Sequence, residues 1–506
     1  MSRILCIGLS IASALIVTVI VLIAVLGNTS QKNNDEFKPL NESDNFMWRH
    51  MPAFASGGFS NPITVERGKI IDFFLANEET NACPMYISVA RQKNIIYRFN
   101  NCSDIFVNHP SSSCNRTLGC YGWKKSFSFT VPSNWISELY VLYFGKNTVY
   151  FVVTHHDPIP NVKNPILIPL PLGTGGLGYN EYTGGSYYAY ANEKYGTTRS
   201  INEQKDANKD PYLRINFRRP VVQSSTPYDP ENVLSKNSKI ITFPLQWTFP
   251  TLSPEILKRA VYVAESDIGV LGEKFLSHFS IMMVVSKQEY IPLESIEALE
   301  KWVHNGGHIY LNGCEFSWFT LEKSLDHEGN NILGGLRRSA GDFEGYNKAF
   351  SAYNWDKALK YYRDNNRFHL VDWSGTRHVV TTNSPEYLNT VVSDHYLSKC
   401  VKQMKVYPYF STFASLSYNN GRWCFTNKTS DLLGVQVDCD NVKIIQVGDS
   451  QFEDGPAAVK AVSGRRWRGV IRHGKGTVFQ AGGGYESPEC EIAWLQRYDS
   501  GKNMLG

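Results

Sequence analysis

Four residues with reactive side chains stand directly after predicted strands in the second half of the chain. They are Tyr179, Glu289, Cys314 and Asp449, and they bring a phenol, two carboxyls and a thiol, groups that serve as metal ligands and nucleophiles. In an open parallel sheet, sites form outside the carboxyl ends of the strands. We therefore expect all four side chains to approach one rim of the sheet.

Common motifs do not account for these residues. The glycine-rich loop from Gly173 to Gly178 lacks the Gly-Lys-Ser/Thr of a phosphate loop, and no G-x-G-x-x-G opens a helix there. The chain contains neither H-E-x-x-H nor C-x-x-C. The pair His155-His156 has no identifiable third ligand, so a structural role is favoured over metal binding.

The elements that would position the rim read as alternating strands and helices. A helix is predicted between Val285 and His308, because Ile296, Leu299 and Trp302 share one face and glycines follow. This alternation indicates an α/β domain with a parallel sheet. Compact apolar runs of the buried-strand type are Ile166 to Leu172, Ala260 to Ala264, Ile281 to Val285, His308 to Leu311, Val442 to Val447 and Gly476 to Ala481.

The first half follows a different pattern, with short strands separated by turns and no helical period. Seven such runs in this length predict an immunoglobulin-like β-sandwich. Prolines at 158, 160 and 165 mark its end. The runs are Ile63 to Val65, Lys69 to Leu75, Met85 to Val89, Ile95 to Phe99, Phe127 to Val131, Leu139 to Phe144 and Val149 to Val153.

The N-terminus is almost wholly apolar from Ile4 to Leu26 and carries no charge there. As a helix this run would span ~34 Å, enough for a hydrocarbon core of ~30 Å. A cleavable signal peptide is the alternative, but its apolar core is usually only ~7–15 residues long. The sequence therefore predicts an uncleaved signal anchor, with the rest of the chain on one side of the membrane.

Glycosylation acceptors and cysteines indicate that this side is lumenal or extracellular. Four of the ten cysteines lie between Cys83 and Cys120, a spacing typical of disulfides in an oxidising compartment. We therefore predict a single-pass type II membrane glycoprotein. Five Asn-x-Ser/Thr sites follow the apolar run, at Asn28, Asn41, Asn101, Asn115 and Asn427.

The length and net charge of the chain limit the expected domains and partners. We expect a signal anchor at 1–27, a polar stalk at 28–45, the sandwich at 46–158, and the α/β domain at 162–506 with an insertion around 325–430. The net charge of +4 is small for 506 residues, and the one basic cluster, around Trp467, is interpreted as a solvated loop. Nucleic acid is therefore not expected as a partner. The membrane is an expected partner, and an oligomer stays open.

The order of several short motifs resembles one family. The chain is similar to the large (beta) subunit of N,N-dimethylformamidase and its relatives, in which a β-sandwich precedes a glutamine-amidotransferase-like α/β domain. No motif is decisive alone, but their order is collinear. They are Gly58 to Gly68, Val131 to Trp135, Tyr179-Asn180, Gly184 to Tyr187, Phe217 to Pro220, Asp267, Gln288-Glu289-Tyr290, Gly306-Gly307, Gly313 to Trp318 and Gly474 to Phe479.

The resemblance implies an iron-dependent amidohydrolase acting on a small amide, with two tyrosines and one glutamate holding the metal. Tyr179 matches one tyrosine and Glu289 the glutamate, and both are also the implied catalytic residues. The second tyrosine position holds Val221, which cannot ligate iron, and Tyr228 is the nearby tyrosine that could replace it. Lys287 stands where the family has histidine.

Two alternatives keep the fold and change the chemistry. The first is a catalytically inactive relative that serves as a binding protein. The second is a cysteine nucleophile at Cys314, since amidotransferase-like folds place theirs on such a turn. Glu315 and Phe316 follow Cys314, where a sharp nucleophile turn needs small neighbours, so a half-cystine or buried thiol is favoured.

Overall fold

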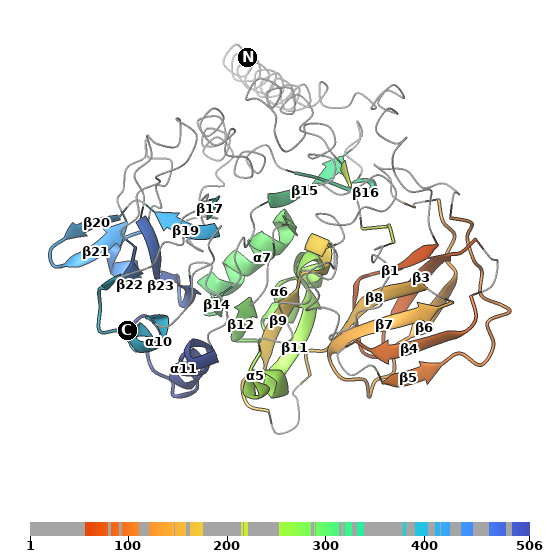
Figure 1. The fold of residues 1–506 in the computed structure, drawn as a ribbon, viewed down its shortest axis with the longest axis horizontal. Coiled ribbons are helices and arrows are strands. Elements are labelled where there is room, and N and C mark those ends of the chain that lie inside the picture. Colours follow the sequence, from red (N-terminus) through yellow and green to blue (C-terminus); the bar gives the residue numbers. More distant parts are fainter. Residues whose placement is uncertain are drawn as a thin grey trace, which may run out of the picture.

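The structure of the chain is a computed structural model. It contains a β-sandwich, a large sheet with helices on both faces, and two smaller sheets (Figure 1). The described residues are 56–78, 82–90, 94–110, 120, 122–145, 147–157, 162–175, 214–215, 217–220, 252–284, 288, 290–312, 316, 319–325, 331–338, 378–380, 390–402, 410–414, 416–425, 437–448, 465–481 and 488–506.

The sandwich consists of a three-stranded sheet, in the order β1-β3-β6, and a five-stranded sheet, in the order β2-β8-β7-β4-β5. Alternate residues of both sheets fill one apolar core that includes Phe73, Leu142 and Phe151. Each of the seven predicted runs overlaps a strand. The strands are β1 Gly57–Asn61, β2 Thr64–Glu66, β3 Ile70–Ala76, β4 Met85–Val89, β5 Ile95–Arg98, β6 Phe127–Thr130, β7 Glu138–Phe144 and β8 Asn147–Thr154.

The large sheet has a parallel half and an antiparallel half. Its parallel strands lie in the order β11-β9-β12-β14-β24. They are β9 Ile166–Leu170, β11 Ala260–Ala264, β12 Ile281–Val284, β14 His308–Leu311 and β24 Gly476–Gln480. Antiparallel to their neighbours are β17 His378–Val380, β18 Thr390–Val391, β19 Phe410–Ala414, β22 Val442–Val447 and β23 Arg465–His473.

Helices cover both faces of this sheet. Helices α6 and α7 pack on the face that presents Leu167 and Val263, whereas α5 and α11 pack on the face that presents Ile168 and Tyr262. The helices are α5 Pro254–Arg259, α6 Ile268–Leu276, α7 Leu293–His304, α10 Ser398–Val401 and α11 Pro488–Asp499, with 3-10 turns η5 Glu265–Asp267 and η6 Cys439–Asn441.

The remaining strands form two small sheets. One is four-stranded, in the order β10-β16-β15-β13, and the other is the hairpin β20-β21. Several of these strands fall in the predicted insertion, most of which lies outside the described residues. They are β10 Arg214–Ile215, β13 Tyr290–Pro292, β15 Phe319–Leu325, β16 Asn331–Arg338, β20 Leu416–Asn419 and β21 Arg422–Phe425.

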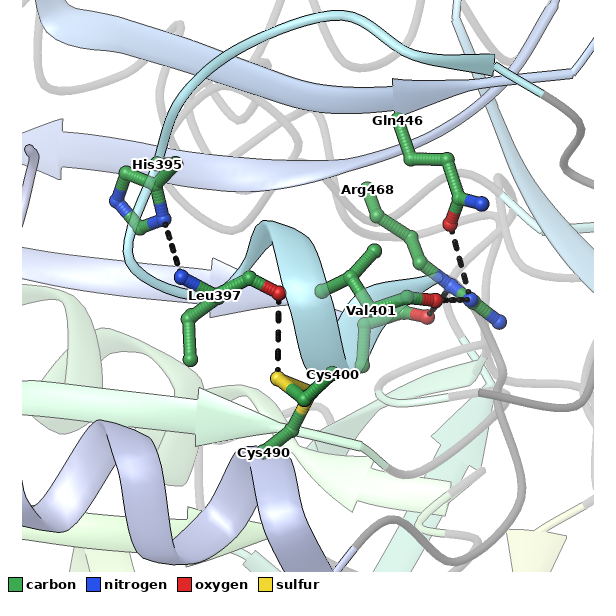
Figure 2. The surroundings of a disulfide bond; sticks show 8 residues. His395, Leu397, Cys400, Val401, Gln446, Arg468 and Cys490 are labelled. Atoms are coloured by element: carbon green, nitrogen blue, oxygen red, sulfur yellow. Dashed lines mark hydrogen bonds between the residues drawn. A yellow bond between two sulfur atoms is a disulfide. The ribbon is translucent and has the colours of Figure 1, made fainter. Parts of the chain in front are cut away.

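The predicted fold class, a parallel-sheet α/β domain behind a membrane helix, is wrong. Helices are few among the described residues. The large sheet is mixed, because β23 pairs antiparallel with β24 on one side and with β22 on the other. The basic cluster around Trp467 is β23 rather than a solvated loop. Arg468 in that strand is fully buried and donates to the carbonyl oxygens of Ala481 and Val401 and to Gln446 Oε1 (Figure 2).

The predicted single-pass membrane protein is contradicted as well. Among the residues that the structure describes, no helix is long and apolar enough to cross a bilayer. The longest, α7 and α11, have 12 residues each, or ~18 Å of helix against a hydrocarbon core of ~30 Å. The predicted segment itself, residues 4–26, lies outside the described residues.

Disulfides, predicted from the cysteine spacing, are confirmed. Cys83–Cys102 links the residues just before β4 to the loop after β5 within the sandwich. Cys400–Cys490 joins α10 to α11 (Figure 2), and Cys424–Cys439 joins β21 to η6. The sandwich is thus cross-linked locally, whereas the second bridge closes a long loop at the C-terminal side of the large sheet.

Candidate functional site

The carboxyl ends of the parallel strands meet at one edge of the large sheet. The pairing places Leu170 of β9 beside Ala264 of β11, and Val284 of β12 beside Leu311 of β14. The residues that follow these ends are therefore neighbours across the edge. The described ones are Gly173 to Gly175 after β9, Glu265 to Asp267 after β11, Gln288 after β12 and Asn312 after β14.

Glu265 holds the segment that leads toward Tyr179. Its carboxylate is fully buried and accepts hydrogen bonds from the backbone N–H of Gly173, at 3.1 Å, and of Thr174, at 2.6 Å. Gly173 is tightly enclosed, because an added Cβ would lie 2.9 Å from Ser266 Cβ and 3.2 Å from the Phe217 ring. The start of the glycine-rich loop is thus fixed by a buried carboxylate and by close packing.

The segment that leads to Val221 lies beside the same loop. At the start of this segment, the Phe217 ring would lie 3.2 Å from a Cβ added to Gly173, and Arg219 is almost completely buried. The carbonyl oxygen of Arg218 accepts a hydrogen bond of 2.7 Å from the backbone N–H of Cys120 in the sandwich. Residues 217–220 are therefore held between the two halves of the chain.

Gln288 fixes the segment that carries Glu289. Its side chain is fully buried, and Nε2 donates to the carbonyl oxygen of Pro169 in β9 at 2.8 Å. The residue before Glu289 is thereby attached to the strand that leads to Tyr179. Three segments, which lead to Tyr179, Val221 and Glu289, start around the carboxyl end of β9.

Asp267 joins this edge to the sandwich. Its carboxylate accepts a 2.5 Å hydrogen bond from the backbone N–H of Thr64 in β2, and Thr64 Oγ1 accepts one of 2.9 Å from the N–H of Ala264. Ser137, before β7, binds the backbone of Tyr262 in the same way. The sandwich is therefore attached along β11, and apolar side chains of both halves share one core.

Burial controls the protonation of both carboxyls. It raises the pKa of Glu265 to about 7, although the hydrogen bonds from Thr174 and Gly173 act in the opposite direction. It likewise raises the pKa of Asp267 to about 6 against the hydrogen bonds from Thr64. Backbone N–H groups donate to both carboxylates, so each already holds part of the chain at this edge.

The raised pKa of Glu265 predicts a pH-dependent contribution to stability. Folding favours its protonated form, so the contribution is complete below about 4.5, its ordinary value, and is lost as pH rises through about 7. We expect wild type to lose about 3 kcal/mol relative to Glu265→Gln over this range, at about 1.4 kcal/mol per unit. Urea unfolding of both proteins between pH 4.5 and 8 measures the difference.

The comparison with Glu265→Gln is needed because other buried groups titrate in the opposite direction. Burial lowers the pKa of His308 and of His395 to about 4, so their contribution grows as pH rises from about 4 to 6.5. Both histidines are present in wild type and in Glu265→Gln, so their contributions cancel when the two free energies of unfolding are subtracted. A difference that stays flat or grows with pH would contradict the assignment to Glu265.

The predicted site residues themselves lie outside the described residues. This holds for Tyr179, Glu289, Tyr228, Cys314 and Asp449. Among the residues that the structure does describe, no group of three or more His, Cys, Asp or Glu side chains could hold a metal ion. The structure thus positions the segments that lead to Tyr179, Val221 and Glu289. It does not describe the side chains of these three residues.

Sequence reasoning missed Glu265, although it follows a strand that was correctly located. The rule that selected Glu289, a polar residue just beyond a buried strand, applies equally to Glu265 after β11. His155 and His156 contact protein groups, as their structural interpretation requires. Nδ1 of His155 lies 3.2 Å from the carbonyl oxygen of Asp157, and Nδ1 of His156 lies 2.7 Å from the Glu66 carboxylate.

Comparison with known protein families finds one family whose model matches this chain. The profile described as N,N-dimethylformamidase beta subunit-like, C-terminal, covers residues 104–482, about three quarters of the chain. The chain belongs to this family. The match begins in the sandwich and ends just beyond β24, so it contains every segment of the rim. No curated protein matches the chain.

Membership in the N,N-dimethylformamidase beta subunit-like family confirms the resemblance seen in the motifs. The matched range includes Tyr179, Glu289 and Tyr228, and also Gly173 and Glu265. The glutamine-amidotransferase-like character of the second domain stays a prediction. Val221, which stands where the resemblance places a tyrosine, also lies inside the matched range.

Proposed function

We propose that this chain is a hydrolase of carbon–nitrogen amide bonds, with its active site at the carboxyl edge of the parallel strands. Family membership supports the reaction class. The observation that carries the location is the convergence of residues 173–174, 217–220 and 288 around the end of β9. Because these three segments lie close together, the residues that follow them in the sequence would face a common space.

The proposed iron ligands are Tyr179, Glu289 and Tyr228. Two phenolates and a carboxylate form a hard oxygen set that suits Fe(III). Val221 supplies no donor atom, so the set is complete only with Tyr228, seven residues later. An iron bound there would polarise the amide carbonyl and acidify a water molecule.

The described residues would contribute orientation and exclusion of water. Glu265 fixes the first residues of the loop that bears Tyr179, and Gln288 attaches the Glu289 segment to β9. Both side chains are fully buried, so the floor of the site excludes bulk water. In a water-excluded site, charged and hydrogen-bonding groups act more strongly on a reacting amide.

Metal content and amide hydrolysis test this proposal together. The purified chain is assayed for iron, for a visible tyrosinate band and for ammonia released from formamide. We expect Glu289→Ala, Tyr179→Ala and Tyr228→Phe each to lose bound iron and to lower kcat/KM at least about 100-fold. Tyr418→Phe, at an exposed tyrosine of β20, is the matched control and is expected to keep both.

A second candidate function is supported by Val221: a catalytically inactive relative that binds its ligand without hydrolysing it. Under this alternative the wild type is metal-free, colourless and well folded. Val221→Tyr then restores the family's donor set and is expected to gain iron and its absorption band. A wild type that binds iron and releases ammonia, with both lost in Tyr228→Phe, would exclude the alternative.

A further inference from the structure

Strand β5 forms an open edge of the sandwich. It stands at one end of the five-stranded sheet, paired with β4 on one side, and among the described residues no strand pairs with its other side (Figure 1). The opposite edge strand, β2, is covered, because Thr64 bonds to Asp267 and Ala264 of the second half of the chain. An open edge presents backbone N–H and C=O groups that can pair with another molecule. In this sheet, β5 is therefore the edge at which such pairing could occur.

The side chains of β5 favour association with another molecule. Ile95, Ile96 and Tyr97 are consecutive and are 40%, 40% and 39% exposed. Tyr97 packs edge-on against Phe129 of the core and is still open to solvent. Arg98 is the only charge of the strand, and a register shift in the pairing with β4 makes Ile96 the extra residue of a β-bulge. Natural proteins blunt open edges with charges, prolines and bulges, and here one charge and one bulge stand against three exposed apolar side chains.

A glycosylation acceptor site follows this strand directly. Asn101-Cys102-Ser103 begins three residues after Arg98, the last residue of β5, so Asn101 is at most ~10 Å away at ~3.3 Å per residue. Asn101 and Ser103 are both exposed. Of the five Asn-x-Ser/Thr sites, this is the one that lies in the described part of the chain. A glycan at this position would stand beside the open edge.

The acceptor site is held in an accessible turn. The backbone N–H of Ser103 donates to Asn101 Oδ1 at 2.9 Å, so the carboxamide nitrogen, which is the atom that bears an N-glycan, lies at the other end of the group. Cys102 forms a disulfide with Cys83, which fixes the turn to the sandwich and indicates an oxidising environment. N-glycans are bulky and solubilising, and they are attached to surface loops of disulfide-forming proteins.

We propose that Asn101 carries an N-linked oligosaccharide that covers the open edge of β5 and keeps the sandwich from associating through it. In the modification, a C–N bond forms between Asn101 Nδ2 and the anomeric carbon of the first sugar. The bond from that carbon to the pyrophosphate of a lipid-linked oligosaccharide donor breaks. The Nδ2 proton passes to the departing pyrophosphate, and no electrons are exchanged.

Peptide mass spectrometry of the full chain, expressed in a host that N-glycosylates, tests the site. An amidase that removes N-glycans converts the asparagine that carried one to aspartate, and we expect this change at Asn101. The neighbouring Asn100 is exposed but begins no acceptor site, so it is the internal control and should stay unchanged. Ser103→Ala should abolish the change at Asn101, whereas Ser103→Thr should keep it.

Light scattering over a range of protein concentrations tests what the glycan does. Ser103→Ala keeps Asn101 and the backbone N–H that binds it, so it removes the glycan and preserves the turn. We expect its apparent Kd for self-association to be at least about 10-fold lower than that of wild type, which corresponds to about 1.4 kcal/mol. Adding Ile96→Lys places a charge on the open edge and should return the Kd to the wild-type value. Ile70→Lys, at a residue of β3 that is 61% exposed, is the matched control and should not.

Three results would overturn the inference. One is an unmodified Asn101 in the wild-type peptide. The second is an unchanged Kd in Ser103→Ala, or in wild type after enzymatic removal of its glycans if this variant does not fold. The third is an association that Ile70→Lys suppresses as well as Ile96→Lys does, since the contact would then not run through β5.

Discussion

Replacing Gly476 by alanine is expected to lower the free energy of unfolding by more than about 3 kcal/mol, the upper range for overpacking a close contact. Gly476 begins β24, and an added Cβ would lie 2.0 Å from the carbonyl oxygen of Gly307 and 2.2 Å from that of Val303. Both atoms belong to the backbone, one in the last turn of α7 and one in the turn after it, so no rotamer change relieves the contact. The strand would have to move away from the helix.

That movement would also break hydrogen bonds at the same turn. The backbone N–H of Lys475 donates to the carbonyl oxygen of His304 at 2.9 Å, and that of Thr477 donates to Gly307 at 3.3 Å. Urea unfolding measures the loss. Gly175→Ala is the control, because its added methyl meets nothing within 4 Å, and we expect a change below about 0.5 kcal/mol. Equal stability of the two variants would contradict the packing argument.

Apolar patterning located most strands of the sandwich, the parallel strands of the large sheet and β22, but not the direction of every strand. The runs at 442–447 and 476–481 were both expected in a parallel sheet, and only β24 is parallel to its neighbour β14. The strand between them, β23, was missed because its run of arginines is typical of a solvated segment. Arg468 is buried only because carbonyl oxygens and Gln446 from distant segments accept its hydrogen bonds, and local sequence contains no sign of them.

The segments that follow the strands could be located from the sequence, whereas the site residues themselves stay a prediction. Gln288 lies in one of the motifs by which the chain resembles the family. Its contact with Pro169, however, joins residues 119 apart in the sequence. Glu265 was selected by no motif, and its role depends on two backbone N–H groups, which every residue type except proline provides. Sequence therefore indicates where such a rim lies, while the pairing of buried polar groups depends on the tertiary structure.

Replacing Glu265 by alanine is expected to cost about 2–6 kcal/mol and to disable the site. The substitution leaves the N–H groups of Gly173 and Thr174 buried without an acceptor, at about 1–3 kcal/mol each. Since the glycine-rich loop starts at these two residues, its first turn loses its attachment to β11. We expect amide hydrolysis to fall at least about 100-fold, as positional errors of about 1 Å do, in protein that is still folded at low temperature.

Glu265→Gln distinguishes the loss of position from the loss of charge. Glutamine keeps one oxygen and places an NH2 group against the second backbone donor, so it preserves one of the two hydrogen bonds. Its stability and activity should fall between those of wild type and Glu265→Ala. The decisive measurement is hydrogen exchange at Gly173 and Thr174, which should accelerate strongly in the alanine variant and less in the glutamine variant. Unchanged exchange with lost activity would mean that Glu265 acts on the reaction directly, because only its carboxyl, and not the loop, would then have changed.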